Sequence, residues 1–103
     1  MNTTHPFEIH NIDGYAFIAA TDLHAALVTW QAYEPWIMTH LVLSGAERGV
    51  DCHVEGDDFT TARLSLPLAE AILTHLPDDM DGAAALQRLQ VTRSLILNGS
   101  VNA

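Results

Sequence analysis

The sequence predicts an α+β domain in which two β-hairpins each precede a pair of helices, in the order ββααββαα. Short runs of alternating apolar residues flank two turn-forming segments, Asn11–Gly14 and Glu55–Asp58, and these predict the hairpins. Apolar residues also recur at helical spacing in four segments. A chain of 103 residues that is 49% apolar can bury one core, so residues 1–103 are expected to form a single domain with flexible ends at 1–6 and 100–103.

The first hairpin joins two short runs in which apolar and other residues alternate. Its expected strands are Phe7–His10 and Tyr15–Ala19. The Asp13-Gly14 pair between them is typical of a tight hairpin turn.

A helix pair is expected after this hairpin. Thr21 is a suitable N-cap for a first helix over Asp22–Thr29, because its hydroxyl can accept an unpaired N–H of the first turn. Trp30–Glu34 then forms a connector. A second helix is expected over Pro35–Ser44: it begins with a proline, whose missing N–H would be unpaired there anyway, and Gly45 ends it.

The second half follows the same order. Val50–Glu55 alternates as a half-buried strand does, and Phe59–Leu64 is its expected partner. Ser65 predicts the start of a third helix over Leu66–His75. A fourth helix is expected over Gly82–Leu97, after an acidic segment whose last residue can cap it.

The charge is strongly negative. Thirteen Asp and Glu oppose four Arg and no Lys, which gives a net charge of −9. Lys and Arg supply most of the affinity for phosphate backbones, so this composition argues against direct binding to nucleic acid and to anionic membranes. It favours a protein partner with a basic surface, since opposite fields steer encounter.

Neither a metal site nor an active site is predicted. The six His show no zinc-ligand spacing, and Cys52 and His53 should point to opposite faces of their strand. Cys52 lies between two valines and beside acidic neighbours, which predicts an unreactive core thiol. The sequence therefore predicts a protein that is not an enzyme and needs no cofactor.

The compartment is predicted to be the cytoplasm. A lone cysteine allows no intrachain disulfide, the N-terminus has no secretory pattern, and no apolar run approaches the length of a membrane span.

Two groups of residues are candidates for contact with a partner. The acidic group lies in two turns, and we weigh a partner-binding role for it evenly against ordinary solvated turn acids; it comprises Asp57, Asp58, Asp78, Asp79 and Asp81. The aromatic group is Trp30 and Tyr33, which lie in the connector, where aromatic side chains can anchor a partner. Trp36 is expected in the core instead, and an exposed Trp30 would favour a homodimer.

Four short motifs follow one another along the chain: Asp22-Leu23-His24, Tyr33-Glu34-Pro35-Trp36-Ile37, Gly49-Val50-Asp51-Cys52 and Leu64-Ser65-Leu66. In this order they resemble the N-terminal domain of phage antirepressors of the AntA/AntB type, and the resemblance spans about Ala19 to Leu89. The family's basic residues after Trp-Ile and in the last helix are replaced here by uncharged ones, and Cys52 stands where the family has an aromatic residue.

The resemblance implies a phage or prophage protein that binds and disables a regulatory or defence protein. The departures in charge mean that DNA contacts of the family should not be carried over. An alternative is an anti-CRISPR protein that blocks a nucleic-acid-binding site on a Cas subunit with its acidic surface.

Overall fold

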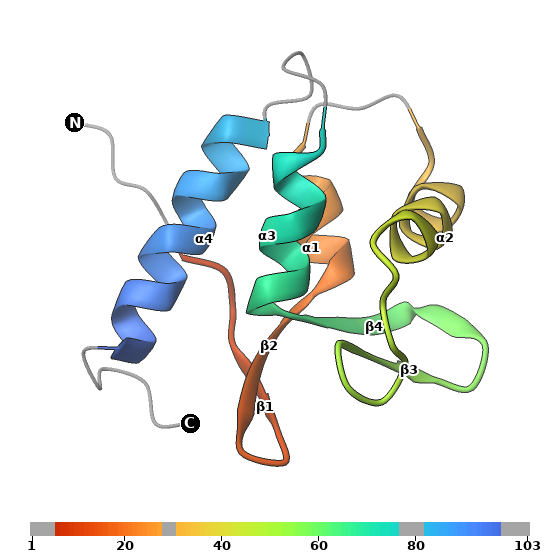
Figure 1. Ribbon diagram of the computed structural model, residues 1–103, viewed down its shortest axis with the longest axis horizontal. Coiled ribbons are helices and arrows are strands. Elements are labelled where there is room, and N and C mark those ends of the chain that lie inside the picture. The colour runs from red at the N-terminus through yellow and green to blue at the C-terminus, as the bar shows by residue number, and fades with distance from the viewer. Residues whose placement is uncertain (1–5, 28–30, 77–81, 98–103) are drawn as a thin grey trace.

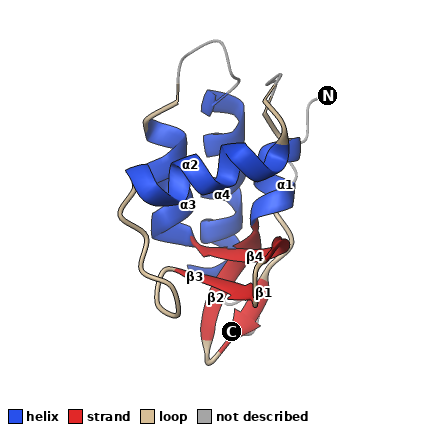
Figure 2. Ribbon diagram, turned by 90° about the vertical axis from the view of Figure 1, so that its right-hand side faces the viewer, coloured by secondary structure: helices blue, strands red, loops and turns tan. Residues whose placement is uncertain are grey.

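The computed structural model describes residues 6–27, 31–76 and 82–97. In these residues a four-stranded antiparallel sheet and four helices form two layers, with the helices above the strands in Figure 2. The α+β class predicted from the sequence is confirmed. None of the helices within the described ranges is long and apolar enough to span a bilayer.

Two hairpins are joined into one sheet. The strands are β1 (His10–Ile12), β2 (Tyr15–Ala19), β3 (Cys52–Glu55) and β4 (Asp58–Ser65). Their order across the sheet is β1-β2-β4-β3 (Figure 1). The β2–β4 pairing sets Ile18 opposite Leu64 and so connects the two hairpins.

The first hairpin has the expected turn but a shifted first strand. Asp13 and Gly14 both have positive φ, 53° and 87°, as a two-residue turn of this kind requires. Such a turn sets Ile12 directly opposite Tyr15, so β1 must run up to Ile12. The expected strand over Phe7–His10 is therefore wrong.

Phe7 belongs to the core instead of a strand. Its backbone N–H donates to Thr92 Oγ1 at 2.8 Å. The guanidinium of Arg88 lies 4.2 Å from the centre of its ring. These contacts fix the chain before β1 against the last helix.

Four helices follow in the predicted order, but the first ends at Ala25, well before the predicted end at Thr29, which lies outside the described residues. They are α1 (Ala20–Ala25), α2 (Tyr33–Leu43), α3 (Leu66–Thr74) and α4 (Gly82–Leu97). Thr21 as an N-cap is wrong: β2 runs directly into α1, and Ala19, which has no capping side chain, occupies that position. Ser65 does cap α3, since its hydroxyl accepts the N–H of Leu68 at 3.2 Å.

The start of α2 also differs from the prediction. The helix begins at Tyr33 rather than Pro35, so part of the expected connector is helical, and Pro35 lies in its first turn. Gly45 follows the last turn with a φ of 63°, as expected for a helix-ending glycine.

The sequence predicts that Val50 begins the second hairpin, but this prediction is wrong, because β3 starts at Cys52. Gly49 has a φ of 88°, and its N–H donates to the carbonyl of Cys52 at 2.7 Å, which closes a tight turn. Val50 lies in that turn with 59% of its surface exposed. Cys52 and His53 do lie on opposite faces of β3, as predicted.

The two faces of the sheet have different surroundings. Ile18, Cys52 and Leu64 point toward the helices and join the main core cluster. Phe17 is 3% exposed but lies on the other face, where the ring of His53 meets it edge-on at 4.8 Å. We call this second face the open face.

Candidate protein-interaction surfaces

Carboxylates gather at the β3–β4 turn. Glu55 and Asp58 are directly opposite each other in the strand register, and Asp57 lies between them in the turn. Like charges in such a cross-strand pair are destabilising. The Arg48 guanidinium donates to the carbonyls of Val54 and Gly56, which holds the turn from its backbone side.

Asp57 and Asp58, the predicted contact residues of this turn, differ in their hydrogen bonds. Both are exposed. The Asp58 carboxylate accepts the N–H of Thr60 at 3.1 Å and also bonds its hydroxyl, so it helps to shape the start of β4. Partner contact by Asp57 and Asp58 stays a prediction.

Several predicted contact residues lie outside the described ranges. These are Trp30, Asp78, Asp79 and Asp81. Asp81, which is expected to cap the start of α4, and Gly99, which is expected to end it, also lie outside the described ranges.

Tyr33 forms a link within the molecule. Its hydroxyl donates to the carbonyl of Phe59 at 2.6 Å and so ties the first turn of α2 to β4. Burial raises the pKa of Tyr33 to about 12, with the positive charge of Arg63 opposing this effect. The side chain is half-buried, and its role in partner contact stays a prediction.

Tyr33 belongs to an aromatic cluster between α1 and α2. Trp36 is fully buried, as predicted, and the rings of His24 and His40 lie 5.1 and 4.9 Å from its ring. His24 also meets Tyr33 edge-on and contacts the carbonyl of Gln31 at 2.9 Å. Within the described residues the indole N–H of Trp36 has no hydrogen-bond partner.

The cluster predicts a pH dependence of stability. Burial lowers the pKa of His40 below its ordinary 6.5, so the folded state binds this proton less readily than the unfolded state. The folded state is therefore most stable above the ordinary pKa of histidine, and it loses stability as the pH falls from that value to the lowered pKa of His40.

We therefore expect urea midpoints to fall from about pH 7.5 to about pH 5.5, and His40→Gln to reduce that fall. His75→Gln, at an exposed site, should retain it. An unchanged pH profile in the His40 variant would refute this assignment.

The four arginines form no basic patch. Arg93 pairs with Glu70 at 3.1 Å, and Arg63 donates to the carbonyls of Thr61 and Ala62. Arg88 stacks on Phe7, and Arg48 holds the β3–β4 turn. Each guanidinium is thus engaged at a separate place in the fold.

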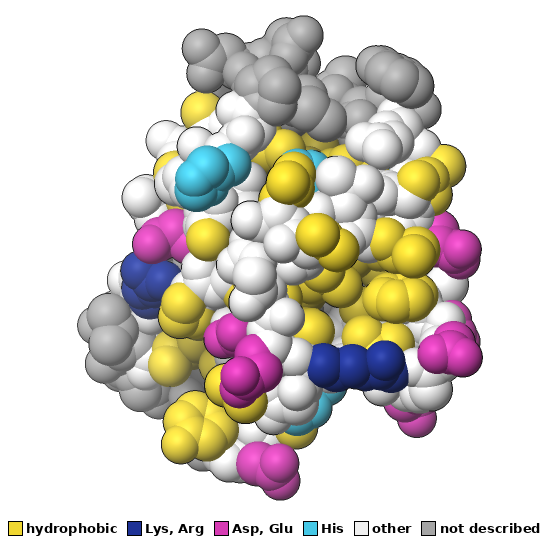
Figure 3. All heavy atoms as spheres, turned by 45° about the vertical axis from the view of Figure 1, so that its right-hand side comes forward, with side chains coloured by type: hydrophobic (Ala, Val, Ile, Leu, Met, Phe, Trp, Pro, Cys, Tyr) yellow, Lys and Arg dark blue, Asp and Glu magenta, His cyan; other side chains and the backbone are white. Residues whose placement is uncertain are grey.

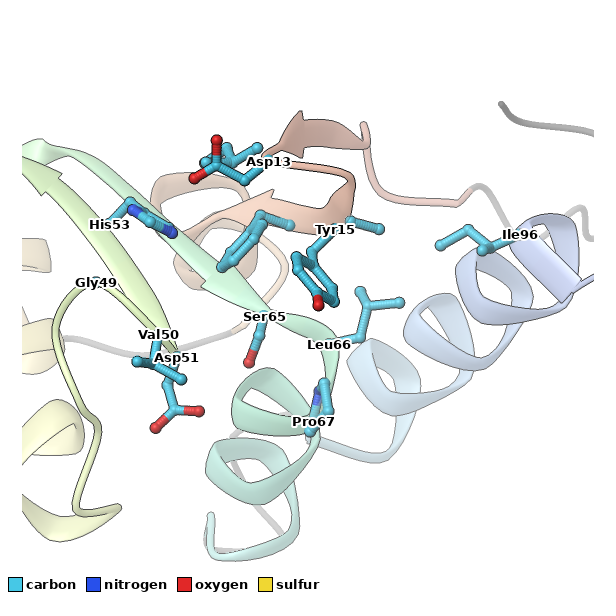
Figure 4. Close-up of a pocket in the computed structure, with 13 residues that line it drawn as sticks. Asp13, Tyr15, Gly49, Val50, Asp51, His53, Ser65, Leu66, Pro67 and Ile96 are labelled. Atoms are coloured by element: carbon cyan, nitrogen blue, oxygen red, sulfur yellow. The ribbon is translucent and has the colours of Figure 1, made fainter. Parts of the chain in front are cut away.

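A groove of about 620 Å³ lies on the open face of the sheet. It lies between the β1–β2 turn, the 49–51 turn and the start of α3, with Ile96 of α4 at one side (Figure 4). Its larger apolar lining residues are Ile12, Tyr15, Phe17, Val50, Leu66, Pro67 and Ile96. The charged residues that line it are Asp13 and Asp51, and no arginine lines it.

The sequence reasoning missed this groove. The sequence pattern places Val50 in a strand, and Tyr15 and Phe17 in the second strand of the first hairpin. The available signal was the strand alternation itself, which places Tyr15 and Phe17 on the face opposite Ile18.

An apolar surface also lies on α2. Met38, Val42 and Leu43 are exposed, the last two by 79% and 74%. Figure 3 shows hydrophobic side chains gathered on this side of the molecule. No charged residue occurs between Glu34 and Glu47, so this surface is uncharged as well as apolar.

The described residues bring together no set of three His, Cys, Asp or Glu side chains that could hold a metal ion. Cys52 is buried, and that burial, followed by the nearby Asp51, raises the pKa of its thiol. The predicted core position of Cys52 is confirmed.

No protein-family model, curated protein or solved structure matches this chain. The resemblance to antirepressor domains therefore stays a prediction.

Proposed function

We propose that this chain is a small inhibitor protein of the antirepressor kind, which binds and disables a nucleic-acid-binding regulatory or defence protein. It acts by binding rather than by catalysis. Its phage or prophage origin is part of the proposal and depends on the motif order from Ala19 to Leu89.

The observation that carries the proposal is the uncompensated negative charge. Among the ten carboxylates in the described ranges, Glu70 pairs with Arg93, and Glu8 lies within contact distance of the His10 ring. The others leave a surface with a negative field, which attracts a basic protein and repels a phosphate backbone.

The β3–β4 turn supports the same proposal. Repulsion between Glu55 and Asp58 costs stability, so a basic partner that neutralises them would relieve it on binding. A surface that normally binds phosphates offers the matching charge. A repressor and a Cas subunit both have such a surface, so the Cas target is retained as the second candidate.

Capture and competition would test the proposal. The tagged chain is incubated with a lysate of the bacterium that carries its gene, and each retained protein is identified. We expect a retained protein to bind DNA or RNA, and that nucleic acid to displace it from the chain. A transcriptional regulator would indicate the first candidate, and a Cas subunit the second.

Retention of proteins with no nucleic-acid-binding activity, or retention that competing nucleic acid leaves unchanged, would contradict the proposal. The nucleic acid must also displace the purified partner from the purified chain, because other molecules in a lysate could bridge the two proteins.

A further inference from the structure

The groove on the open face combines apolar walls with acidic edges. Tyr15 and Val50, at its edge, are 72% and 59% exposed. Phe17 also lines the groove but is only 3% exposed, and its ring meets that of His53 edge-on. Large apolar side chains gathered in a concave surface are typical of binding sites.

Its two carboxylates lie on different sides of the hollow. Asp13 is at the β1–β2 turn, and Asp51 is in the turn before β3 (Figure 4). No lining cation neutralises them. Arg63 lines a neighbouring hollow with Glu55, and its guanidinium is bonded to backbone carbonyls of its own strand.

Hydrogen bonds hold the Asp51 edge of the groove in place before any ligand binds. The Asp51 carboxylate accepts the N–H of Glu47 at 3.0 Å. The Asp51 carbonyl accepts the N–H of Ser65 at 2.8 Å, which ties this turn to the start of α3. A preformed site loses less conformational entropy on binding than a mobile one.

From this geometry we infer that the groove is a docking site for a segment of the partner protein in which an apolar side chain stands next to Lys or Arg. The apolar side chain fills the space between Tyr15 and Val50. The neighbouring cations lie toward Asp13 and Asp51. This inference rests on the proposed function and assigns it a contact surface distinct from the β3–β4 turn.

Charge complementarity selects this occupant. An acidic peptide or a phosphate would face two carboxylates with no cation in the lining. A second copy of this chain would bring a net charge of −9 toward the same edges.

A matched pair of peptides tests the inference. Acetyl-Arg-Trp-Arg-amide and acetyl-Glu-Trp-Glu-amide are titrated into the ¹⁵N-labelled full chain, and amide shifts are followed by NMR. We expect the Arg peptide to shift the amides of Gly49, Val50, Asp51, His53 and Ser65. It should bind at least about fivefold more tightly than the Glu peptide.

Matched variants separate the groove from the general field of the protein. Asp13→Asn with Asp51→Asn should lower the affinity for the Arg peptide to the affinity that the parent chain has for the Glu peptide. Asn tolerates the positive φ of Asp13 and keeps an acceptor at position 51. Asp22→Asn with Glu34→Gln removes the same number of charges outside the groove lining and should leave peptide affinity nearly unchanged.

An apolar variant tests the walls. Val50→Asn should lower the affinity for the Arg peptide. Because the position is exposed, the melting temperature should stay close to that of the parent chain.

The inference is overturned if the shifts fall on α2 or on the β3–β4 turn, if both peptides bind alike, or if millimolar peptide shifts no groove amide. Its failure is distinct from failure of the proposed function. If a captured nucleic-acid-binding protein binds the groove variants as tightly as the parent chain, the proposed function holds but the groove is not its contact site. If the Arg peptide binds the groove but no nucleic-acid-binding protein is captured, the groove is a binding site but the proposed function is wrong.

Discussion

Trp36→Ala should lower the free energy of unfolding by about 3–5 kcal/mol. The side chain is fully buried between α1 and α2, and rings of two histidines pack against it. Its removal leaves a cavity that these short helices cannot close without losing their contact with the sheet. A loss of this size is a large part of the stability of a small domain.

Urea midpoints and slopes for three variants would check this result. Val42→Ala is the control in the same helix: the residue is 79% exposed, so a change within about 0.5 kcal/mol is expected. Trp36→Phe should cost less than Trp36→Ala, because it keeps most of the apolar volume and removes an N–H that lacks a partner among the described residues. Equal losses in the Ala variants of Trp36 and Val42 would contradict the buried position of the indole.

Replacing the acidic turn residues should slow association with the partner by about tenfold or more at low salt. The variant changes Asp57, Asp58, Asp78, Asp79 and Asp81 to Asn. Exposed charges act mainly on the association rate, because they steer the encounter and contribute less once the complex is formed. The melting temperature should change little, because Asn is about as favourable as Asp in turns and at helix N-caps.

A matched pair of smaller variants separates position from net charge. Asp57→Asn with Asp58→Asn and Asp22→Asn with Glu34→Gln each remove two charges. The first pair should slow association more than the second, since its carboxylates lie beside Glu55 at the β3–β4 turn. Equal effects would show that only net charge matters, and an unchanged rate in all variants would favour contact through Trp30 and Tyr33.

The order of elements was predictable because its signals are local. Asp13-Gly14 can form a tight turn on its own, and Ser65 can cap α3 without help from distant residues. The predicted bounds of strands and helices are wrong where tertiary contacts determine the local conformation. Phe7 leaves the expected strand because α4 offers Thr92 and Arg88, and α1 begins at Ala20 because β2 delivers the chain directly into the core.

The candidate surfaces were less predictable than the fold. The acids of the β3–β4 turn are visible in the sequence, since adjacent Asp residues mark a turn. The groove is not, because it needs the β1–β2 turn, the 49–51 turn and Ile96 of α4 to meet. Sequence alternation can place Tyr15 and Phe17 on one face, yet only the β2–β4 pairing brings Ser65 and its helix beside them.

The salt dependence of the association rate with a purified, captured partner tests the central claim most directly. Charges on an exposed surface are screened beyond about 8 Å at physiological ionic strength, and more strongly as salt rises. If the acidic surface steers a basic partner, the rate should fall by about tenfold or more between about 50 mM and about 500 mM salt, with a much smaller change in the dissociation rate. An association rate that stays constant across this range would contradict binding through the acidic surface.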